Sequence, residues 1–293
     1  EVNIKEGDTI VAINGIPTDK DTSPEKLLSH QANRYVLLSI QPKKVNSDIR
    51  HLHVKTLGNI KPLLYRTWVE NNRAYVLKKS QGRFGYIHIP DMSKAGITEF
   101  YRNYQQSYDH EGIIIDVRYN GGGHTSTMIL QQLAITRFGL DFTRWHGAAF
   151  SYPFSAPRGN MVAICNAQTG SDGDIFSYAF KTLKLGTLFG QRTWGGVVGI
   201  NVRNSLLDGG VTTQPEYAVW FKNDGYSIEN HGVDPDIEVD CTLGNIAKED
   251  KQLDAAIEYL FNQQDSTPFA LEKALDNEKK PDKKPKKLPE SAN

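Results

Sequence analysis

A serine between glycines is the residue whose type and spacing point most directly to chemistry. Ser171 stands in TGSDGD (169–174), after the apolar run NMVAIC and before the helical pattern IFSYAFKTLKL. Glycines permit a tight turn that exposes the hydroxyl, and a helix start presents free N–H groups and a positive dipole. A serine nucleophile whose substrate carbonyl becomes an oxyanion has these requirements. Taken alone, however, the motif favours the plainer interpretation that Ser171 is a helix cap.

A second glycine-rich turn follows the apolar run IIIDV. Gly121–Gly123 is either a flexible loop or a set of backbone N–H groups that binds an anion, and no GK[ST] or GxGxxG pattern assigns it to a nucleotide. Ligands of open α/β sheets gather beyond the carboxyl ends of the strands. Two such turns after two strands of one sheet therefore predict a shared oxyanion hole.

A nucleophilic serine needs a base, and histidine is the usual one. By position the best candidates are His124, next to the triple glycine, and His231, near Glu229. His88 alternates within an apolar strand, which is typical of a packed core residue. None of the eight histidines has a spacing that identifies it as catalytic, so each is interpreted as structural.

The cysteine and histidine pattern predicts no metal and no cofactor. Cys165 and Cys241 are the only cysteines, and HExxH and CxxC are absent. We interpret both cysteines as buried free thiols rather than as a disulfide framework.

Composition excludes several classes of protein. The 293 residues carry 34 Lys+Arg and 34 Asp+Glu, so the net charge is zero, which argues against a dedicated nucleic-acid binder. No apolar run reaches the ~20 residues that span a bilayer. Hydrophobic residues make up 39% of the chain, enough for a sizeable core.

The elements that must position these residues follow from the hydrophobic pattern. Residues 1–43 combine a strand, an Asn-Gly turn, a helix opened by Ser23-Pro24 and a second strand, and with EGDTIVAING they resemble the carboxy-terminal half of a PDZ domain. Residues 44–80 are a connecting segment. Residues 81–264 alternate buried strands with helices, which predicts an α/β domain with parallel strands. The Lys/Pro-rich residues 265–293 form a solvated tail.

Five motifs in order then identify a family. DVRYNGGG, TGSDGDIFSYAFK, GQRTWGGVVG, VTTQPEYAVWF and ENHGVDPDIEV closely resemble the carboxy-terminal part of tricorn-type serine proteases, which are related to tail-specific proteases. The resemblance covers residues 1–262. It implies a crotonase-like (ClpP/crotonase) βαβ spiral core, oligopeptide or unfolded-protein substrates, a homo-oligomer and a cytoplasmic location, with export left open.

The resemblance also implies roles for individual residues. Tail-specific proteases use a Ser–Lys dyad, but Gly196 occupies the matching lysine position, which excludes that dyad. Tricorn-type enzymes use a Ser–His pair before the PDZ domain and a glutamate that matches Glu229. The oxyanion hole would then be the N–H of Asp172 and one from Gly122 or Gly123. Asp141 is the candidate that receives a basic substrate side chain.

The resemblance further implies that the catalytic histidine lies outside these 293 residues, because the sequence begins within the PDZ-like segment. We therefore expect the chain alone to lack peptidase activity. Two other functions stay open here. One is a peptide-binding scaffold without catalysis, and the other is a crotonase-like acyl-CoA enzyme, whose fold also joins glycine-rich oxyanion loops to βαβ units.

Overall fold

The computed structural model describes residues 3–44, 47–142, 149–201, 205–240 and 250–263. The chain divides into two units, Glu1–Trp68 and Val69–Asn293, and each is described by itself. Cys241, His146 and the expected tail lie outside the described residues.

The first unit is a four-stranded antiparallel sheet with the order β2-β1-β3-β4. Asn14 and Gly15 have positive φ angles and form the expected turn between β1 and β2. The strand β4 pairs with β3 along its length, so part of the expected connecting segment belongs to this sheet. The elements are β1 (Thr9–Ile13), β2 (Ile16–Pro17), α1 (Pro24–Leu27), β3 (Tyr35–Gln41) and β4 (Arg50–Lys55).

A helix that the sequence pattern does not assign follows this sheet. The helix α2 (Lys61–Lys79) buries only Val69 and Val76 fully, so it has no broad apolar stripe. Such a narrow stripe gives a weak helical period, which explains why the pattern leaves the segment unassigned.

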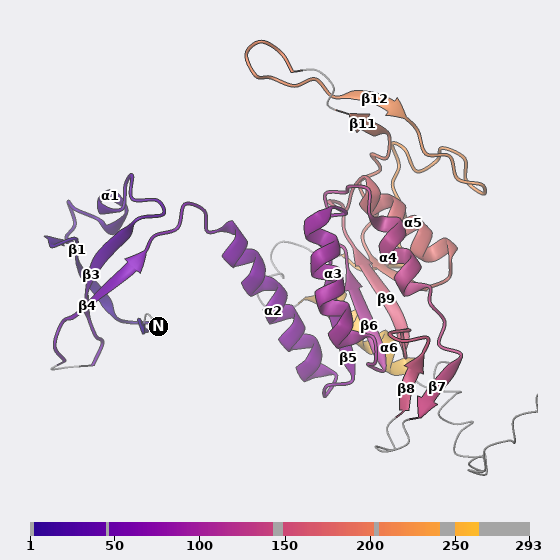
Figure 1. Ribbon diagram of the computed structural model, residues 1–293, viewed down its shortest axis with the longest axis horizontal. Coiled ribbons are helices and arrows are strands. Elements are labelled where there is room, and N and C mark those ends of the chain that lie inside the picture. Colours follow the sequence, from indigo (N-terminus) through magenta and orange to yellow (C-terminus); the bar gives the residue numbers. More distant parts are fainter. Residues whose placement is uncertain (1–2, 45–46, 143–148, 202–204, 241–249, 264–293) are drawn as a thin grey trace, which may run out of the picture. The chain divides into compact units, whose positions relative to one another are not determined.

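The second unit contains the expected parallel sheet, with the order β13-β10-β9-β6-β5 (Figure 1). Every residue of β5 and β6 is buried, as expected for strands with both faces covered. The mixed α/β architecture confirms the predicted fold class. The strands are β5 (Phe84–His88), β6 (Gly112–Asp116), β9 (Asn160–Cys165), β10 (Gly186–Gly190) and β13 (Ile237–Glu238); the helices are α3 (Lys94–Ser107), α4 (Ser126–Leu133), α5 (Asp172–Thr182) and α6 (Lys251–Asn262).

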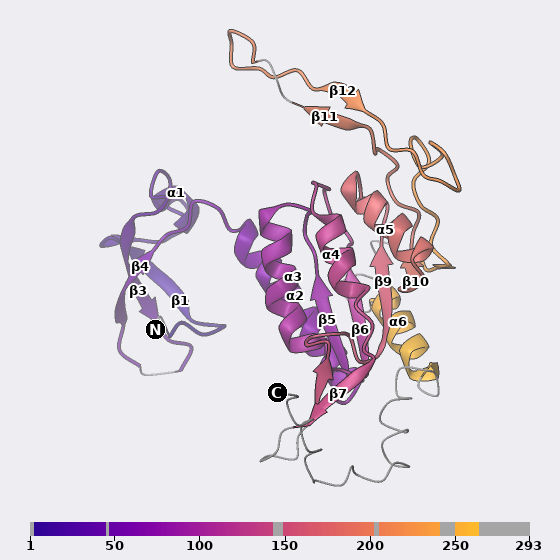
Figure 2. The ribbon, with the colours of Figure 1, turned by 45° about the vertical axis from the view of Figure 1, so that its right-hand side comes forward.

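Two hairpins lie at opposite ends of the sheet (Figures 1 and 2). The pair β7 (Gly139–Phe142) and β8 (Ala149–Tyr152) lies near the start of β9. The pair β11 (Gly199–Asn201) and β12 (Gln214–Tyr217) projects beyond the carboxyl ends of the strands. All residues of β12 are exposed, and in β11 only Gly199 is buried, so little of this pair lies in the core.

Candidate active site

Ser171 occupies a strained turn between β9 and α5. Its φ of +56° and ψ of −120° are rare for a residue with a side chain. The residue stands at the N-cap position, but its hydroxyl makes no capping hydrogen bond. The structure therefore does not support a side-chain cap as the role of this serine, and the hydroxyl is left for another use.

The two glycine-rich turns meet at Ser171, as the sequence predicts. Gly170 N–H donates to the carbonyl of Asn120 at 2.9 Å. A Cβ placed on Gly122 would lie 2.5 Å from the Cβ of Ser171, and Gly122 has a φ of +85°. The close approach and the positive φ both require glycine at this position.

The hydrogen bonds distinguish the two glycines that are candidate oxyanion donors. Gly122 N–H donates to Asn120 Oδ1 at 2.9 Å, so it is already engaged. Gly123 forms a parallel bridge with Met92. The two hydrogen bonds of this bridge come from the neighbours of Gly123: Met92 N–H donates to the carbonyl of Gly122, and His124 N–H donates to the carbonyl of Met92. In the described part of the chain, the N–H of Gly123 has no acceptor.

Asp172 is the other candidate donor, and its side chain joins two helices. As the first residue of α5 its N–H has no partner within the helix. Its buried carboxylate accepts the N–H and the hydroxyl of Ser126, at the start of α4, the former at 3.0 Å. The resemblance assigns a role to the N–H of Asp172 but none to its carboxylate. Capping of a second helix depends on residues 46 positions apart.

Asp174 connects the nucleophile turn to the loop 193–198. This fully buried carboxylate accepts the N–H of Gly195 at 2.8 Å. Burial raises the pKa of Asp174, although hydrogen bonds from Thr193 and Gly195 oppose that effect. A buried carboxylate with a raised pKa next to a candidate nucleophile fits a functional site.

The raised pKa of Asp174 predicts how the stability of the chain depends on pH. The folded state holds the Asp174 proton more tightly than the unfolded state does. Protonated Asp174 therefore stabilises the fold below the ordinary carboxyl pKa, and this stabilisation is lost as pH rises through the pKa of the folded state. Asp174→Asn retains an acceptor and cannot ionise. The stability of this variant relative to the unaltered chain is expected to increase from pH 3.5 to 7, measured by urea unfolding. A difference that stays constant or falls over this range would contradict the assignment.

Glu229 fixes the other end of the same loop. Its Oε2 accepts the N–H groups of Val197 and Val198 at 2.7 and 2.8 Å. The neighbouring Asn230 N–H donates to the carbonyl of Gly195 at 2.7 Å. Among the described residues Glu229 Oε1 has no hydrogen-bond partner, so one carboxylate oxygen is left for a group from elsewhere.

Replacement of Glu229 tests this anchoring role. Glu229→Gln keeps an oxygen acceptor for the two valine N–H groups but loses the charge that strengthens those bonds. We expect unfolding of the isolated chain to require about 1 kcal/mol less free energy, measured with urea. Glu238→Gln, on the exposed end of β13, is the control. Equal stability of the two variants would show that the carboxylate does not hold the loop.

In the described part of the chain, no hydrogen bond joins any histidine to the Ser171 hydroxyl. His88 is a buried core residue as predicted, its Nε2 lies 3.0 Å from the carbonyl oxygen of Arg118, and burial lowers its pKa. His124 Nδ1 lies 3.4 Å from the hydroxyl of Tyr217. His231 pairs with Asp234 at 2.9 Å on the surface.

Asp141 lies far from this constellation within the chain. It is exposed on β7, at the end of the sheet where β9 begins, whereas Ser171 follows the end of β9 (Figure 1). The structure therefore does not bring Asp141 to Ser171, and its role as a receiver of basic side chains stays a prediction.

A buried ion pair that the sequence analysis missed lies beneath the glycine turn. Arg118 Nη2 lies 2.6 Å from Asp116 Oδ2, and both side chains are almost fully buried. Arg118 also reaches Asp250, the N-cap of α6, at 2.9 Å. The DVR motif is the signal that could have revealed it, because it puts an acid and a base two residues apart at the end of an apolar run.

Three further observations concern metal ligands, membrane-spanning helices and the cysteine thiol. Among the described residues, no group of three or more His, Cys, Asp or Glu is placed to hold a metal ion. No described helix combines the length and the apolar character required to cross a membrane. Cys165 is a buried free thiol, as expected, and burial raises its pKa.

Sequence comparison connects these features to known proteins. The chain is 47% identical over 257 residues to the tricorn protease of Thermoplasma volcanium, covering 87% of this chain and 25% of that protein. It is 43% identical over 268 residues to tricorn protease homolog 1 of Streptomyces coelicolor, covering 91% of this chain and 25% of the relative. The chain thus spans about a quarter of the length of these relatives.

Structural comparison and family profiles agree. The crystal structure of the tricorn protease matches with a TM-score of 0.84 and 42% identity, over 89% of this chain and 25% of that chain. The tricorn protease PDZ domain profile matches residues 1–59, and the profile of peptidase family S41 matches residues 83–239. A profile match over more than half of the chain, on the fold and turns described above, shows that this protein belongs to peptidase family S41.

Proposed function

We propose that this chain carries the nucleophile and oxyanion hole of a serine endopeptidase that hydrolyses oligopeptides or unfolded protein. The observation that carries the proposal is the strained Ser171, which has an uncapped hydroxyl and packs against Gly122. The adjoining residues Gly123 and Asp172 have N–H groups without an acceptor among the described residues. The family assignment does not favour the acyl-CoA enzyme or the non-catalytic scaffold.

The reaction follows from the positions of these groups. Ser171 Oγ attacks the carbonyl carbon of the peptide bond as its proton passes to a base, and the carbonyl oxygen becomes an oxyanion. Donors fixed before the reaction stabilise that charge without reorganisation, and the adjacent start of α5 adds its dipole. The protonated base then donates to the leaving amine, and water hydrolyses the acyl-enzyme by the reverse steps.

The base in this proposal comes from a Ser–His pair outside the chain, as the tricorn resemblance implies. Two observations support it. No described histidine is hydrogen-bonded to Ser171, and Glu229 Oε1 has no partner among the described residues. Glu229 would orient the base through the serine of that pair. Asp141 remains the proposed receiver of basic side chains, and a cytoplasmic homo-oligomer remains the proposed working form.

The division of catalytic groups gives a direct test. The chain of 293 residues alone is expected to show no hydrolysis of fluorogenic peptides, because among the described residues no histidine is hydrogen-bonded to Ser171 as a base. The intact protein that includes the upstream segment is expected to hydrolyse them and to react with a fluorophosphonate probe at Ser171. Ser171→Ala in the intact protein is the control. Hydrolysis by the chain alone that disappears in Ser171→Ala would contradict a base from outside the chain and direct attention to His124 or His231.

A further inference from the structure

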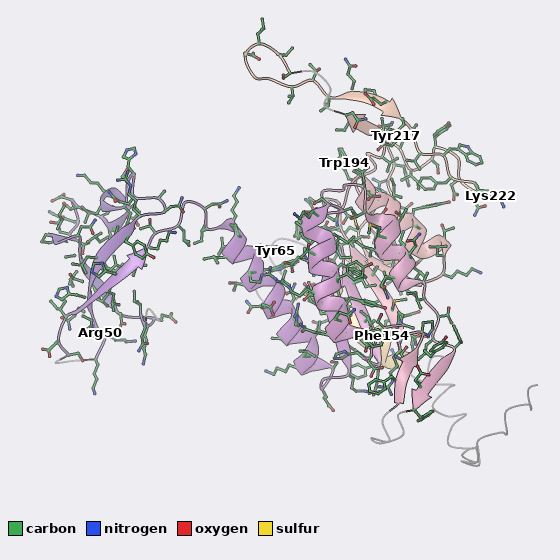
Figure 3. The ribbon with its side chains drawn as sticks, in the orientation of Figure 1. Arg50, Tyr65, Phe154, Trp194, Tyr217 and Lys222 are labelled. Atoms are coloured by element: carbon green, nitrogen blue, oxygen red, sulfur yellow. The ribbon has the colours of Figure 1, made fainter. Side chains whose placement is uncertain are left out.

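A large aromatic ring lies exposed beside the candidate nucleophile. Trp194 is 65% exposed, although hydrophobic side chains of this size are usually covered. The backbone N–H of Trp194 donates at 2.9 Å to the carbonyl of Thr169, in the turn that carries Ser171. Figure 3 places Trp194 at the end of the sheet where the strands finish, near Tyr217.

Part of this ring lies against glycine backbone, while most of its surface is exposed. A Cβ on Gly170 would lie 2.9 Å from Trp194 Cε3, and a Cβ on Gly196 would lie 2.2 Å from its Cζ3. Gly170 directly precedes Ser171, so the indole is in contact with the backbone that carries the nucleophile. Any side chain at either position would push the ring away, because its Cβ would lie closer to the ring than van der Waals contact allows.

The loop that carries the ring is anchored from several sides. Gly195 N–H is held by Asp174, and the N–H groups of Val197 and Val198 are held by Glu229. Thr193 Oγ1 accepts the N–H of Val233 at 2.8 Å. The ring is therefore positioned before any ligand arrives, and rigid aromatic side chains bind with little loss of conformational entropy.

We propose that the exposed surface of the Trp194 indole is a subsite for an apolar or aromatic side chain that flanks the scissile bond of a peptide substrate. The inference rests on the proposed peptidase function, because it uses Ser171 to locate the bond. A ring that packs against backbone and stays 65% exposed offers stacking and apolar burial to a substrate residue. A peptide that presents its carbonyl to Gly123 and Asp172 passes beside this ring, since Gly170 lies next to Ser171.

The experiment measures kcat/KM of the intact protein for peptides with Phe, Leu, Lys or Gly at one position, first before and then after the cleaved bond. Trp194→Ala is expected to lower the Phe-to-Gly preference on one side of the bond about tenfold. Trp194→Phe is expected to restore most of that preference. Trp220→Ala, which removes another exposed tryptophan, is the matched control and is expected to keep the preference.

Other outcomes would overturn the inference. An unchanged Phe-to-Gly preference in Trp194→Ala would exclude the subsite, and loss of a Lys-to-Gly preference alone would contradict its apolar class. Failure of the proposed function gives a different result, since Ser171→Ala would then leave turnover intact or no peptide would be cleaved. In that case binding of a Phe peptide, measured by calorimetry, still decides the subsite: weaker binding by Trp194→Ala than by Trp220→Ala supports it, and equal binding excludes it.

Discussion

Replacing Gly122 with alanine is expected to lower kcat/KM for peptide hydrolysis by about 10²–10³-fold. The new Cβ would lie 2.5 Å from the Cβ of Ser171 and 3.0 Å from the N of Asp172. Both the nucleophile and one oxyanion donor would have to move. The φ of +85° adds backbone strain for any residue with a side chain.

Gly121→Ala is the matched control for this prediction. A Cβ on Gly121 meets nothing within 4 Å, and its φ lies outside the left-handed region. The comparison uses kcat/KM and the rate of fluorophosphonate labelling of the intact protein, together with the urea midpoint of each variant. Equal kcat/KM for Gly122→Ala and Gly121→Ala would show that Ser171 does not react at this turn.

Replacing Arg118 with methionine is expected to remove about 3–5 kcal/mol from the free energy of unfolding. Burial opposes ionisation of Asp116, yet the Arg118 guanidinium holds the pKa of that carboxyl below its usual value. Methionine fills similar space but leaves a charge with no counter-ion in the core. The loss also weakens the attachment of α6, because Arg118 contacts Asp250 at its N-cap.

Urea unfolding of the chain measures this effect, with two comparisons. Arg102→Met removes an exposed helical ion pair with Glu99 and is expected to cost only about 0.3–0.5 kcal/mol. The double variant Asp116→Asn/Arg118→Met removes the stranded charge and is expected to recover part of the loss.

The pH gives a further check on the ion pair. The low pKa of Asp116 contributes stability above its unfolded value, and this stability is lost as pH falls. The difference in free energy of unfolding between Arg118→Met and the unaltered chain should therefore become smaller in acid, where Asp116 binds a proton. Losses of equal size for Arg118→Met and Arg102→Met would contradict a buried ion pair.

Local patterns predicted the architecture well because burial leaves a strong periodic signal. The runs EGIIIDVR and NMVAICN are strands with both faces covered, and STMILQQL and DKQLDAAIEYLFNQQ are helices with one buried face. The pattern was weaker where burial is incomplete. The helix α2 and the short strands β11 and β12 show this, since few of their side chains contact a core.

The sequence by itself determined which residues could react. The spacing of glycines around Ser171 and at 121–123 indicated a tight turn and a shared crevice, and the order of the motifs indicated the family. These properties depend on residue type and on neighbours along the chain, so they can be read without coordinates.

Only the tertiary structure decided which groups are free to act. Gly122 and Gly123 are equivalent in the sequence, but the first N–H is bound to Asn120 and the second is not. Asp172 and Glu229 likewise differ from simple helix-start and surface carboxylates because they accept N–H groups 46 and 31–32 residues away. The direction of a hydrogen bond between distant segments depends on how the strands and loops close in space, which residue type and spacing do not specify.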